Sequence, residues 1–403
     1  MYYIPGYIKI QEVENKIILV NQYTNASVSL ETKYKEELKK IINNGSEDTS
    51  TELEIFLNKY KFLLDDKNFV KEFKSYFEDN NKFLRFILMP TEKCNFRCTY
   101  CYEQHDNGEQ NLDYQAIVEF LKEKVNERDW KGINISWFGG EPLLKLDEIN
   151  KFHQQIQQLI SQKDIKTSIV TNAYTLNENA ISILEKANVM YYQITVDGNA
   201  QDRLRVLKNG KPTFDVIMNN LKTLKNHEFI NCVIRVNVSD TSDDNYHFYE
   251  VLYSMIGNDA RFIVDVHKVF ESDLFKLDSY EKVNEMYQRN IENIKQFGFN
   301  LLNSNNNLIQ CYGARKNTYT FRTNQSIVKC TVSLNAPWNQ IGNITNHKVV
   351  LNGSNNTYCL EEERIKSCMR CKNIFKCKSF SCPKNMYEKR NCKAEKFTID
   401  NEE

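Results

Sequence analysis

From Phe83 onward, short apolar runs alternate with longer amphipathic stretches. Each apolar run has the length of a buried strand, and each amphipathic stretch repeats apolar residues every three or four positions, as a helix with one buried face does. Six such pairs follow one another, with the apolar runs FLRFILM, INISWF, TSIVTN, MYYQITV, NCVIRVNV and RFIVDVHKV. Strands that alternate with helices form a parallel sheet. We therefore predict an α/β fold over residues 81–300, with the sheet open or curled into a partial (β/α)6 barrel.

The regions on either side of this pattern differ from it. Residues 1–80 contain the alternating segments YIKIQEV and KIILVNQ and then helical stretches. This predicts a small domain of short strands followed by two or three helices. Residues 301–403 are rich in Asn and Cys and show little periodicity. Because a segment with so little apolar content is not held together by burial alone, we expect bound metal to stabilise it.

Charge and composition narrow the class of protein. The 403 residues include 53 Lys and Arg against 53 Asp and Glu, so no excess of basic residues indicates a nucleic acid or an anionic membrane as partner. Neither a signal peptide nor a membrane-spanning apolar stretch is recognisable, and we expect a cytoplasmic protein. Thiols stay reduced in the cytoplasm. The twelve cysteines therefore predict metal binding or redox chemistry in preference to a disulfide framework.

Three of these cysteines lie on one loop, directly after the first predicted strand. Cys94, Cys98 and Cys101 form a CxxxCxxC motif. Three thiolates can hold three irons of a cubane cluster and leave the fourth iron open to a ligand, whereas a structural zinc is normally closed by a fourth protein ligand. The motif therefore favours an open iron–sulfur cluster. A zinc site completed by a distant His or Cys is the alternative.

Polar residues and glycines follow the later strands of the pattern. Because the carboxyl ends of parallel strands meet at one edge of a sheet, we expect these residues to gather near the cysteine loop. They are Gly139, Gly140 and Glu141 after the second strand, Thr171 and Asn172 at the end of the third, Thr195 and Asp197 at the end of the fourth with Arg205 beyond it, and Arg235 and Asn237 on the fifth. Paired glycines let backbone approach a ligand, and a carboxylate accepts hydrogen bonds from an ammonium group.

Taken in chain order, these motifs resemble those of the radical S-adenosylmethionine (SAM) superfamily: CxxxCxxC with an aromatic residue, Tyr100, before its last cysteine, then GGEP, TNA, ITVDG and RVN. The resemblance implies that Cys94, Cys98 and Cys101 hold a [4Fe–4S] cluster whose open iron binds the amino and carboxyl groups of SAM. It also implies the activity. Reductive cleavage of SAM yields methionine and a 5′-deoxyadenosyl radical, which abstracts a hydrogen atom from the substrate.

The same resemblance assigns the contacts of the cofactor. It places Gly139, Gly140 and Glu141 at the methionine amino group of SAM, Thr195 at its ribose or carboxylate, Arg205 at its carboxylate, and Tyr100 and Asn172 elsewhere in the cofactor site. The chain departs from the family pattern at two positions. Ala173 stands where a glycine is usual, and Gln201 stands where a histidine is frequent.

The C-terminal cysteines resemble the SPASM extension of radical SAM enzymes, which binds two auxiliary [4Fe–4S] clusters. The resemblance assigns the outer cluster to Cys368, Cys371, Cys377 and Cys392, and the inner one to Cys311, Cys330 and Cys382. The fourth ligand of the inner cluster is then either Cys359 or a substrate thiolate. The chain departs from this extension in the spacing of Cys377 and Cys382 and at Gln325, where a glycine is usual. Two zinc knuckles are the alternative.

SPASM enzymes mostly modify ribosomally made peptides. Residues 1–80 resemble the winged-helix element that captures a leader peptide by adding its strand to a sheet edge, although a simple cap on the barrel also fits. We therefore expect a peptide maturase that installs a cross-link in a precursor peptide with a leader, served by a reducing partner such as flavodoxin or ferredoxin. The missing fourth ligand favours a Cys thioether. The alternatives are a carbon–carbon cross-link, an anaerobic sulfatase maturase that makes formylglycine, and a catalytically silent zinc scaffold that binds peptides.

Three further residues lie within the predicted strands. Asp265 and His267 are candidates for a catalytic base, because they are polar residues in a strand of the barrel. Such residues are more often satisfied within the structure. Cys232, in the fifth strand, is expected to be a small buried apolar residue.

Overall fold

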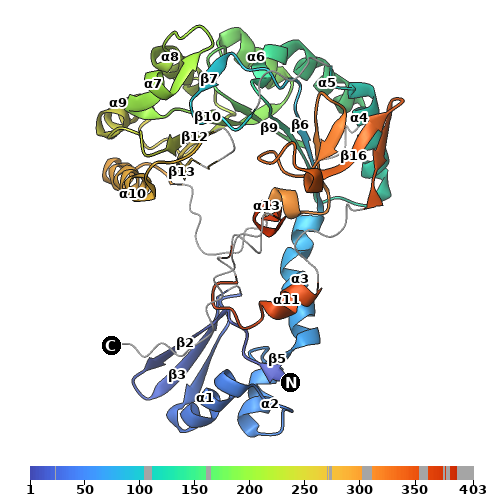
Figure 1. Ribbon diagram of the computed structural model, residues 1–403, viewed down its shortest axis with the longest axis vertical. Coiled ribbons are helices and arrows are strands. Elements are labelled where there is room, and N and C mark those ends of the chain that lie inside the picture. The colour runs from blue at the N-terminus through green and yellow to red at the C-terminus, as the bar shows by residue number, and fades with distance from the viewer. Residues whose placement is uncertain are drawn as a thin grey trace. The chain divides into compact units, whose positions relative to one another are not determined.

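The computed structural model describes residues 1–22, 24–103, 111–159, 165–269, 271, 275–301, 311–353, 362–374, 377 and 382–387. The chain divides into two compact units (Figure 1). The first unit comprises residues 1–82, 304–316 and 353–403, and the second comprises residues 83–303 and 317–352. The cysteine-rich segment 301–403 is therefore shared between the two units.

The second unit is built on the predicted parallel sheet. Its six parallel strands lie in chain order and are β6 (Phe83–Leu88), β8 (Gly132–Trp137), β9 (Ile165–Thr171), β10 (Val189–Thr195), β12 (Asn231–Val238) and β13 (Phe262–Lys268). Figure 1 shows helices along the outer side of this sheet. They are α4 (Tyr114–Glu127), α5 (Leu146–Leu159), α6 (Glu178–Lys186), α8 (Phe214–Lys225), α9 (Tyr246–Ile256) and α10 (Tyr280–Phe297). The predicted α/β fold of a partial (β/α)6 barrel is confirmed.

The two faces of this sheet differ in composition. One face is fully buried and packs on the helices, where Trp137 meets Phe152 of α5 edge to face at 5.5 Å and Phe86 stacks on Phe120 of α4 at 5.8 Å. The residues on the other face, which alternate with these along each strand, are half-buried and mostly polar. They include Ser136, Ser168, Gln193, Thr195, Arg235, Asn237, Asp265 and His267. Period-two alternation therefore leaves a polar inner face on a sheet whose other face is apolar.

Four further strands extend this sheet beyond β6, where the sequence shows little periodicity. β14 (Thr318–Phe321) pairs in parallel with β6, and β15 (Ser326–Val328), β16 (Gln340–Thr345) and β17 (Lys348–Leu351) continue the sheet antiparallel. β14 is buried along its whole length. The added strands are short, and both faces of β14 are covered. The alternation of apolar and polar residues that usually marks a strand is therefore absent.

The first unit begins with small β-elements. β2 (Ile8–Val13), β3 (Lys16–Asn21) and β4 (Ser27–Glu31) form a three-stranded antiparallel sheet, while β1 (Tyr2–Tyr3) pairs with β5 (Leu64–Asp65). The helices are α1 (Lys35–Asn44), α2 (Glu52–Lys59) and α3 (Asp66–Asn81). Thr51 and Glu54 form a reciprocal capping box that starts α2. The predicted strands and helices of residues 1–80 are present.

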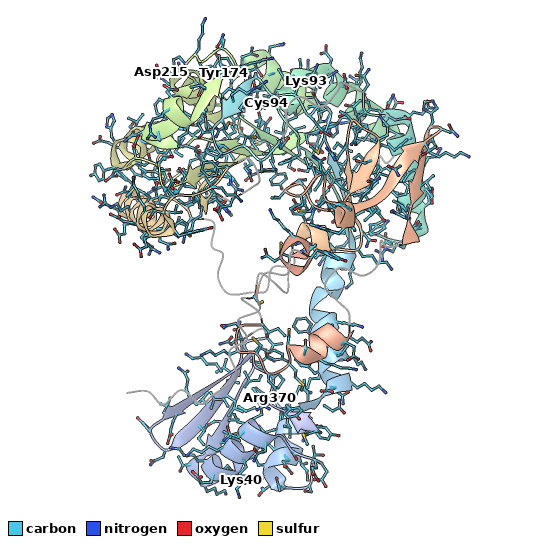
Figure 2. The ribbon with its side chains drawn as sticks, in the orientation of Figure 1. Lys40, Lys93, Cys94, Tyr174, Asp215 and Arg370 are labelled. Carbon is cyan, nitrogen blue, oxygen red and sulfur yellow. The ribbon has the colours of Figure 1, made fainter. Side chains whose placement is uncertain are left out.

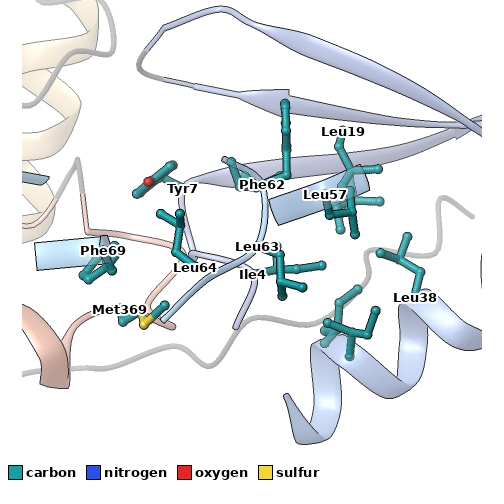
Figure 3. Close-up of a cluster of buried hydrophobic side chains, with 14 of the residues drawn as sticks. Ile4, Tyr7, Leu19, Leu38, Leu57, Phe62, Leu63, Leu64, Phe69 and Met369 are labelled. Carbon is teal, nitrogen blue, oxygen red and sulfur yellow. The ribbon is translucent and has the colours of Figure 1, made fainter. Parts of the chain in front are cut away.

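The core of the first unit includes residues from the far end of the chain. Ile4, Tyr7, Leu57, Leu63 and Phe69 are at most 3% exposed (Figure 3). Ile365, Met369 and Ile374, from α11 (Glu362–Ser367) and the turn after it, join the same cluster. No helix among the described residues is long and apolar enough to cross a membrane.

Candidate active site

The CxxxCxxC motif lies on the loop that follows β6. Cys94 precedes β7 (Phe96–Cys98), which pairs antiparallel with β11 (Arg205–Leu207) so that Cys98 lies opposite Arg205. The amide of Cys101 donates to the carbonyl of Cys98 at 3.1 Å. Figure 2 labels Lys93 and Cys94 on this loop. The three cysteines are half-buried, and the pairing with β11 fixes them beside an arginine from a later strand.

The paired glycines of the GGEP motif lie against the start of the cysteine loop. The amide of Gly140 donates to the carbonyl of Thr91 at 3.1 Å, and that of Glu141 donates to the carbonyl of Lys93 at 2.9 Å. A Cβ at Gly140 would lie 2.2 Å from the Lys93 carbonyl oxygen, and Gly139 has a φ of 119°. Only glycine tolerates so close a carbonyl at position 140 or this positive φ at position 139. The motif therefore holds the segment that leads into Cys94.

Glu141 links the turn after β8 to the end of β9 through its side chain. Its side chain is 0% exposed, and its oxygens accept from Thr171 Oγ1 at 2.7 Å, from the Asn172 amide at 2.7 Å and from the Leu143 amide at 3.0 Å. Burial raises the pKa of this carboxyl, while the hydrogen bonds from Thr171 and the two amides act against the shift. Glu141 therefore positions Asn172.

Asn172 in turn contacts the cysteine loop. Its side-chain nitrogen lies 2.7 Å from Asn95 Oδ1 and 3.8 Å from Cys94 Sγ. The next residue, Ala173, is fully buried and has a φ of 59°, in the left-handed region that glycine favours. Ala173 therefore adopts a backbone conformation that suits the glycine usual at this position.

Tyr100 belongs to a hydrogen-bonded group at the ends of β10 and β12. Its hydroxyl donates to Asp197, which is 1% exposed, and accepts from Asn237 Nδ2 at 3.1 Å. The amide of Asn237 donates to Asp197 Oδ1 at 3.0 Å. Burial, followed by the neighbouring charge of Asp197, raises the pKa of Tyr100 well above its ordinary value. Tyr100 is therefore a neutral donor to Asp197.

Arg205 is buried next to this group with unused donors. Its side chain is 5% exposed, and Nη1 lies 4.0 Å from Asp197 Oδ1. The guanidinium lies over the Phe96 ring at 5.6 Å. Nε and Nη1 of Arg205 have no hydrogen-bond partner within the described structure. Because an unsatisfied buried donor is costly, the site is suited to a ligand that accepts hydrogen bonds.

Gln201 is the second departure from the family pattern, and its hydrogen bonds connect the Asp197 loop to Arg205. It is 0% exposed, accepts from the Asp197 amide at 2.9 Å and donates to Thr213 Oγ1 at 2.9 Å. Thr213 Oγ1 donates to the carbonyl of Arg205 at 2.8 Å. Gln201 therefore connects the loop of Asp197 to the backbone of Arg205.

The inner face of the sheet carries the remaining candidates from strands β10 to β13. Thr195 lies half-buried at the end of β10, opposite Arg235 of β12. Arg235 Nε donates to Asn237 Oδ1 at 3.1 Å. His267 Nε2 lies 3.2 Å from Asp265 Oδ2 on β13. Cys232 is 1% exposed on the opposite, helix-facing side of the sheet, as expected for a small apolar residue.

The environment of the three cysteines disfavours free thiolates. Removal from water raises the pKa of Cys94 and of Cys101 to about 12. It also raises the pKa of Cys98, where the charge of Arg205 acts in the opposite direction. Ligation of these cysteines as thiolates would therefore be accompanied by release of their protons.

A buried ion pair that no sequence motif indicates joins this loop to Arg322, directly after β14. Arg322 Nε and Nη2 lie 2.9 Å from Oε1 and Oε2 of Glu92, and both side chains are nearly fully buried. Glu103 lies close to both, and burial, followed by the charge of Glu92, raises its pKa to about 8. A Glu and an Arg 230 positions apart carry no motif that would pair them.

The cysteines assigned to auxiliary clusters are divided between the units. Cys311, Cys368, Cys371, Cys377 and Cys382 belong to the first unit, and Cys330, which is 4% exposed, belongs to the second. A hydrogen bond from Cys311 lowers the pKa of Cys382 to about 6, with support from the amides of Asn385 and Lys384. Cys359 and Cys392 lie outside the described residues.

Gln325 is the remaining departure, upstream of Cys330. Its φ is 65°, again in the region that glycine favours, and its side chain donates to the carbonyls of Asn111 at 2.8 Å and Thr323 at 3.0 Å. These side-chain bonds offset the backbone strain.

In the described ranges, no three His, Cys, Asp or Glu side chains are grouped so that they would hold one metal ion.

Comparisons with known proteins agree with this geometry. The radical SAM cyclopropyl synthase TigE of Paramaledivibacter caminithermalis is 24% identical over 307 residues, which is 70% of this chain and 63% of TigE. A cysteine-type anaerobic sulfatase-maturating enzyme of Clostridium novyi is 28% identical over 183 residues, 42% of this chain and 48% of that enzyme. The chain thus spans less than two thirds of either relative.

A solved structure of the protein anSMEcpe with bound AdoMet shares the fold. It matches with a TM-score of 0.56 and 15% identity, over 74% of this chain and 89% of that one. The family model of the radical SAM superfamily matches residues 88–252. This range contains the CxxxCxxC loop, the GGEP turn, Asn172, Thr195 and Arg205. Residues 88–252 therefore form a radical SAM domain.

Proposed function

We propose that this protein is a radical SAM maturase that installs a Cys thioether in a ribosomally made peptide. The observation that carries the cofactor part of the proposal is the buried Arg205, whose Nε and Nη1 have no partner among the described residues and lie beside the CxxxCxxC loop. A carboxylate is the natural acceptor for such a guanidinium.

We assign SAM and a [4Fe–4S] cluster, which the family implies, to this site. Cys94, Cys98 and Cys101 supply three thiols from one half-buried loop, the number that leaves one iron open. Arg205 supplies the unsatisfied donors for the carboxylate of SAM. Glu141 is already bonded to three donors, so we assign it first to positioning Asn172 and the loop, with Gly139 and Gly140 supporting the same segment.

The bound cofactor would supply a 5′-deoxyadenosyl radical. In the cross-linking reaction, one C–H bond and one S–H bond of the peptide break and one C–S bond forms. These changes release one hydrogen atom, one thiol proton and one electron; the bound cofactors would accept the hydrogen atom and the electron, and a base would accept the proton. We assign the auxiliary clusters to Cys368, Cys371, Cys377 and Cys392 and to Cys311, Cys330 and Cys382, with Cys359 or the peptide thiolate as the remaining inner ligand.

Two features support a peptide as substrate. The inner face of the sheet is half-buried and polar, with Arg235, Asn237 and the Asp265–His267 pair along it, which suits a chain rich in amide groups. The sheet β2-β3-β4 of the first unit has two edge strands, and an extended leader can pair with such an edge.

The relatives named as a cyclopropyl synthase and a sulfatase-maturating enzyme support a maturase. We place the reaction in the cytoplasm, with flavodoxin or ferredoxin as reductant.

Mass spectrometry of a co-expressed precursor peptide tests the proposal. The enzyme is expressed with a short cysteine-containing peptide encoded beside it, and the peptide is weighed before and after alkylation. Loss of two hydrogens together with one cysteine that no longer alkylates would support a thioether. The same loss with every cysteine reactive would contradict the sulfur chemistry and favour a carbon–carbon bond. A Cys98→Ala variant is the control that must leave the peptide mass unchanged.

A further inference from the structure

The turn after β10 carries Asp197, and the side chain of Asn245 holds it from behind. Gly198 in this turn has a φ of 66°, and a Cβ at this position would overlap the Oδ1 atom of Asn245. The same oxygen accepts a hydrogen bond from the amide of Asn199 at 2.9 Å. Asn245 is 1% exposed. Its side chain therefore fixes the backbone directly beyond Asp197.

Asn245 occupies the N-cap position of α9, yet its side chain makes no capping hydrogen bond. An asparagine at this position usually accepts from a backbone amide in the first turn of its helix, and that bond stabilises the start of the helix. Here the side-chain oxygen of Asn245 accepts from Asn199 instead. The residue therefore serves the turn after β10 in preference to its own helix.

The nitrogen of the Asn245 side chain bonds to Asn290, on the buried face of α10. Asn245 Nδ2 donates to Asn290 Oδ1 at 3.0 Å, and Asn290 Nδ2 donates to the carbonyl of Met286 at 2.7 Å. Asn290 is 1% exposed, and a buried side-chain amide is costly unless it is bonded. Both amides accept from the side of the turn and donate toward α10. We call this series, from Asn199 through Asn245 and Asn290 to Met286, the amide relay.

Asp197 is the residue through which the amide relay reaches the candidate cofactor site. Its carboxylate accepts from the hydroxyl of Tyr100 and from the amide of Asn237 at 3.0 Å. Nη1 of Arg205 lies 4.0 Å from the same carboxylate. Because Asp197 directly precedes Gly198, a displaced turn moves the carboxylate relative to all of these groups. Hydrogen bonds weaken steeply as they lengthen or bend, so a small displacement is sufficient.

We propose that Asn290 and Asn245 are positioning residues that couple α10 to the cofactor site through Asp197. The part of this inference that concerns the cofactor rests on the proposed function, whereas the coupling rests on the hydrogen bonds of the amide relay. α10 packs against β13 and α9 at the outer side of the sheet (Figure 1). A helix outside the barrel thus determines where the carboxylate beside Tyr100 and Arg205 lies.

Amide NMR spectra of the full chain, recorded without iron or SAM, test the coupling. Asn290→Leu replaces the amide by an apolar group of similar shape and removes the acceptor of Asn245. The matched control is Tyr249→Phe, because the Tyr249 hydroxyl donates to the same Asn290 oxygen at 2.7 Å but is not part of the amide relay. Each change removes a hydrogen bond to the same atom. We expect the amide proton of Asn237, which reports on the Asp197 carboxylate, to move upfield in Asn290→Leu and to keep its position in Tyr249→Phe.

Two results would overturn the coupling. One is an unmoved Asn237 signal in Asn290→Leu, and the other is an equal movement in Tyr249→Phe. If Asn290→Leu does not fold, Asn245→Ala takes its place in the comparison. It interrupts the amide relay at its middle residue and leaves Asn290 bonded to Tyr249. An unmoved Asn237 signal in Asn245→Ala would then overturn the proposal.

Equilibrium dialysis of SAM against the reconstituted protein tests the link to the cofactor. The dissociation constant should rise about five- to tenfold in Asn290→Leu, because a weakened hydrogen-bond network no longer holds Arg205 in place, and it should stay the same in Tyr249→Phe. Unchanged affinity in Asn290→Leu, together with a moved Asn237 signal, would overturn the positioning role. Absence of SAM binding by the unchanged protein would instead contradict the proposed function, while the NMR result would still support the coupling.

Discussion

Oε2 of Glu141 lies 2.7 Å from the backbone amide of Asn172, and this bond joins the turn after β8 to the end of β9. Through it, a carboxylate in the GGEP motif determines where the Asn172 side chain meets Asn95 and Cys94. The acidic residue of the motif is thus a positioning residue for the cysteine loop, whatever further contact it makes with a cofactor.

Replacing Glu141 by Ala should destabilise the second unit. The change leaves the hydroxyl of Thr171 and the amides of Asn172 and Leu143 without their acceptor, at a cost of about 3 kcal/mol in the free energy of unfolding. Urea unfolding measures this loss. Glu127→Ala, at an ion pair on the surface, is the control and should change stability by less than about 0.5 kcal/mol. An equal effect of the two changes would contradict the positioning role.

Replacing Arg205 by Met should weaken binding of SAM about tenfold or more, because a hydrogen bond to a charged group contributes about 1.5–3 kcal/mol. Equilibrium dialysis of the reconstituted protein measures the dissociation constant, and iron content should stay the same. Arg203→Met, two residues earlier and exposed in an ion pair with Asp243, should leave the binding of SAM unchanged. Unaltered affinity in Arg205→Met would remove Arg205 from the cofactor site.

Replacing Ala173 by Gly should stabilise the protein. The left-handed backbone at Ala173 costs an alanine about 1–2 kcal/mol, while glycine adds about 0.4–1 kcal/mol of entropy to the unfolded chain. The free energy of unfolding should therefore rise by about 0.5–1 kcal/mol. Ala180→Gly, within α6, should instead lower it by about 1 kcal/mol. A loss of stability in both variants would show that the backbone at residue 173 is not strained.

The stability of the second unit should fall as the pH is lowered from about 6.5 to 4, in part because of His153. Trp137 Nε1 donates to His153 Nε2 at 2.9 Å, and burial lowers the pKa of His153 to about 4. Below pH 6.5 the unfolded chain binds a proton that the folded chain excludes, so folding loses up to about 3 kcal/mol by pH 4. Above pH 6.5 this contribution is fully present.

The comparison protein for this measurement is His153→Gln, whose amide oxygen can accept from Trp137 without titrating. Urea unfolding at a series of pH values should show a smaller loss between pH 6.5 and 4 for His153→Gln than for the unchanged protein. Any loss of stability that both proteins share comes from other titrating side chains. Identical pH profiles would mean that His153 already binds its proton in the folded state.

The sequence by itself determined the parallel sheet and the position of the cysteine loop. Buried strands and amphipathic helices each have a local period, and that period is visible in any short window of the chain. The order of CxxxCxxC, GGEP, TNA and ITVDG then predicted which strand ends carry the candidate site, because parallel strands present their carboxyl ends at one edge. The resemblance to the radical SAM superfamily followed from that order.

Only the tertiary structure decided how these residues are used. That Glu141 bonds to Asn172, that Arg205 keeps unused donors, and that Gln201 joins Asp197 to Thr213 are contacts between segments far apart in the chain. The membership of Met369 in the N-terminal core, in the same cluster as Tyr7, is of the same kind. Local patterns report which face of an element is buried, but the partner on that face is set by the packing of the whole domain.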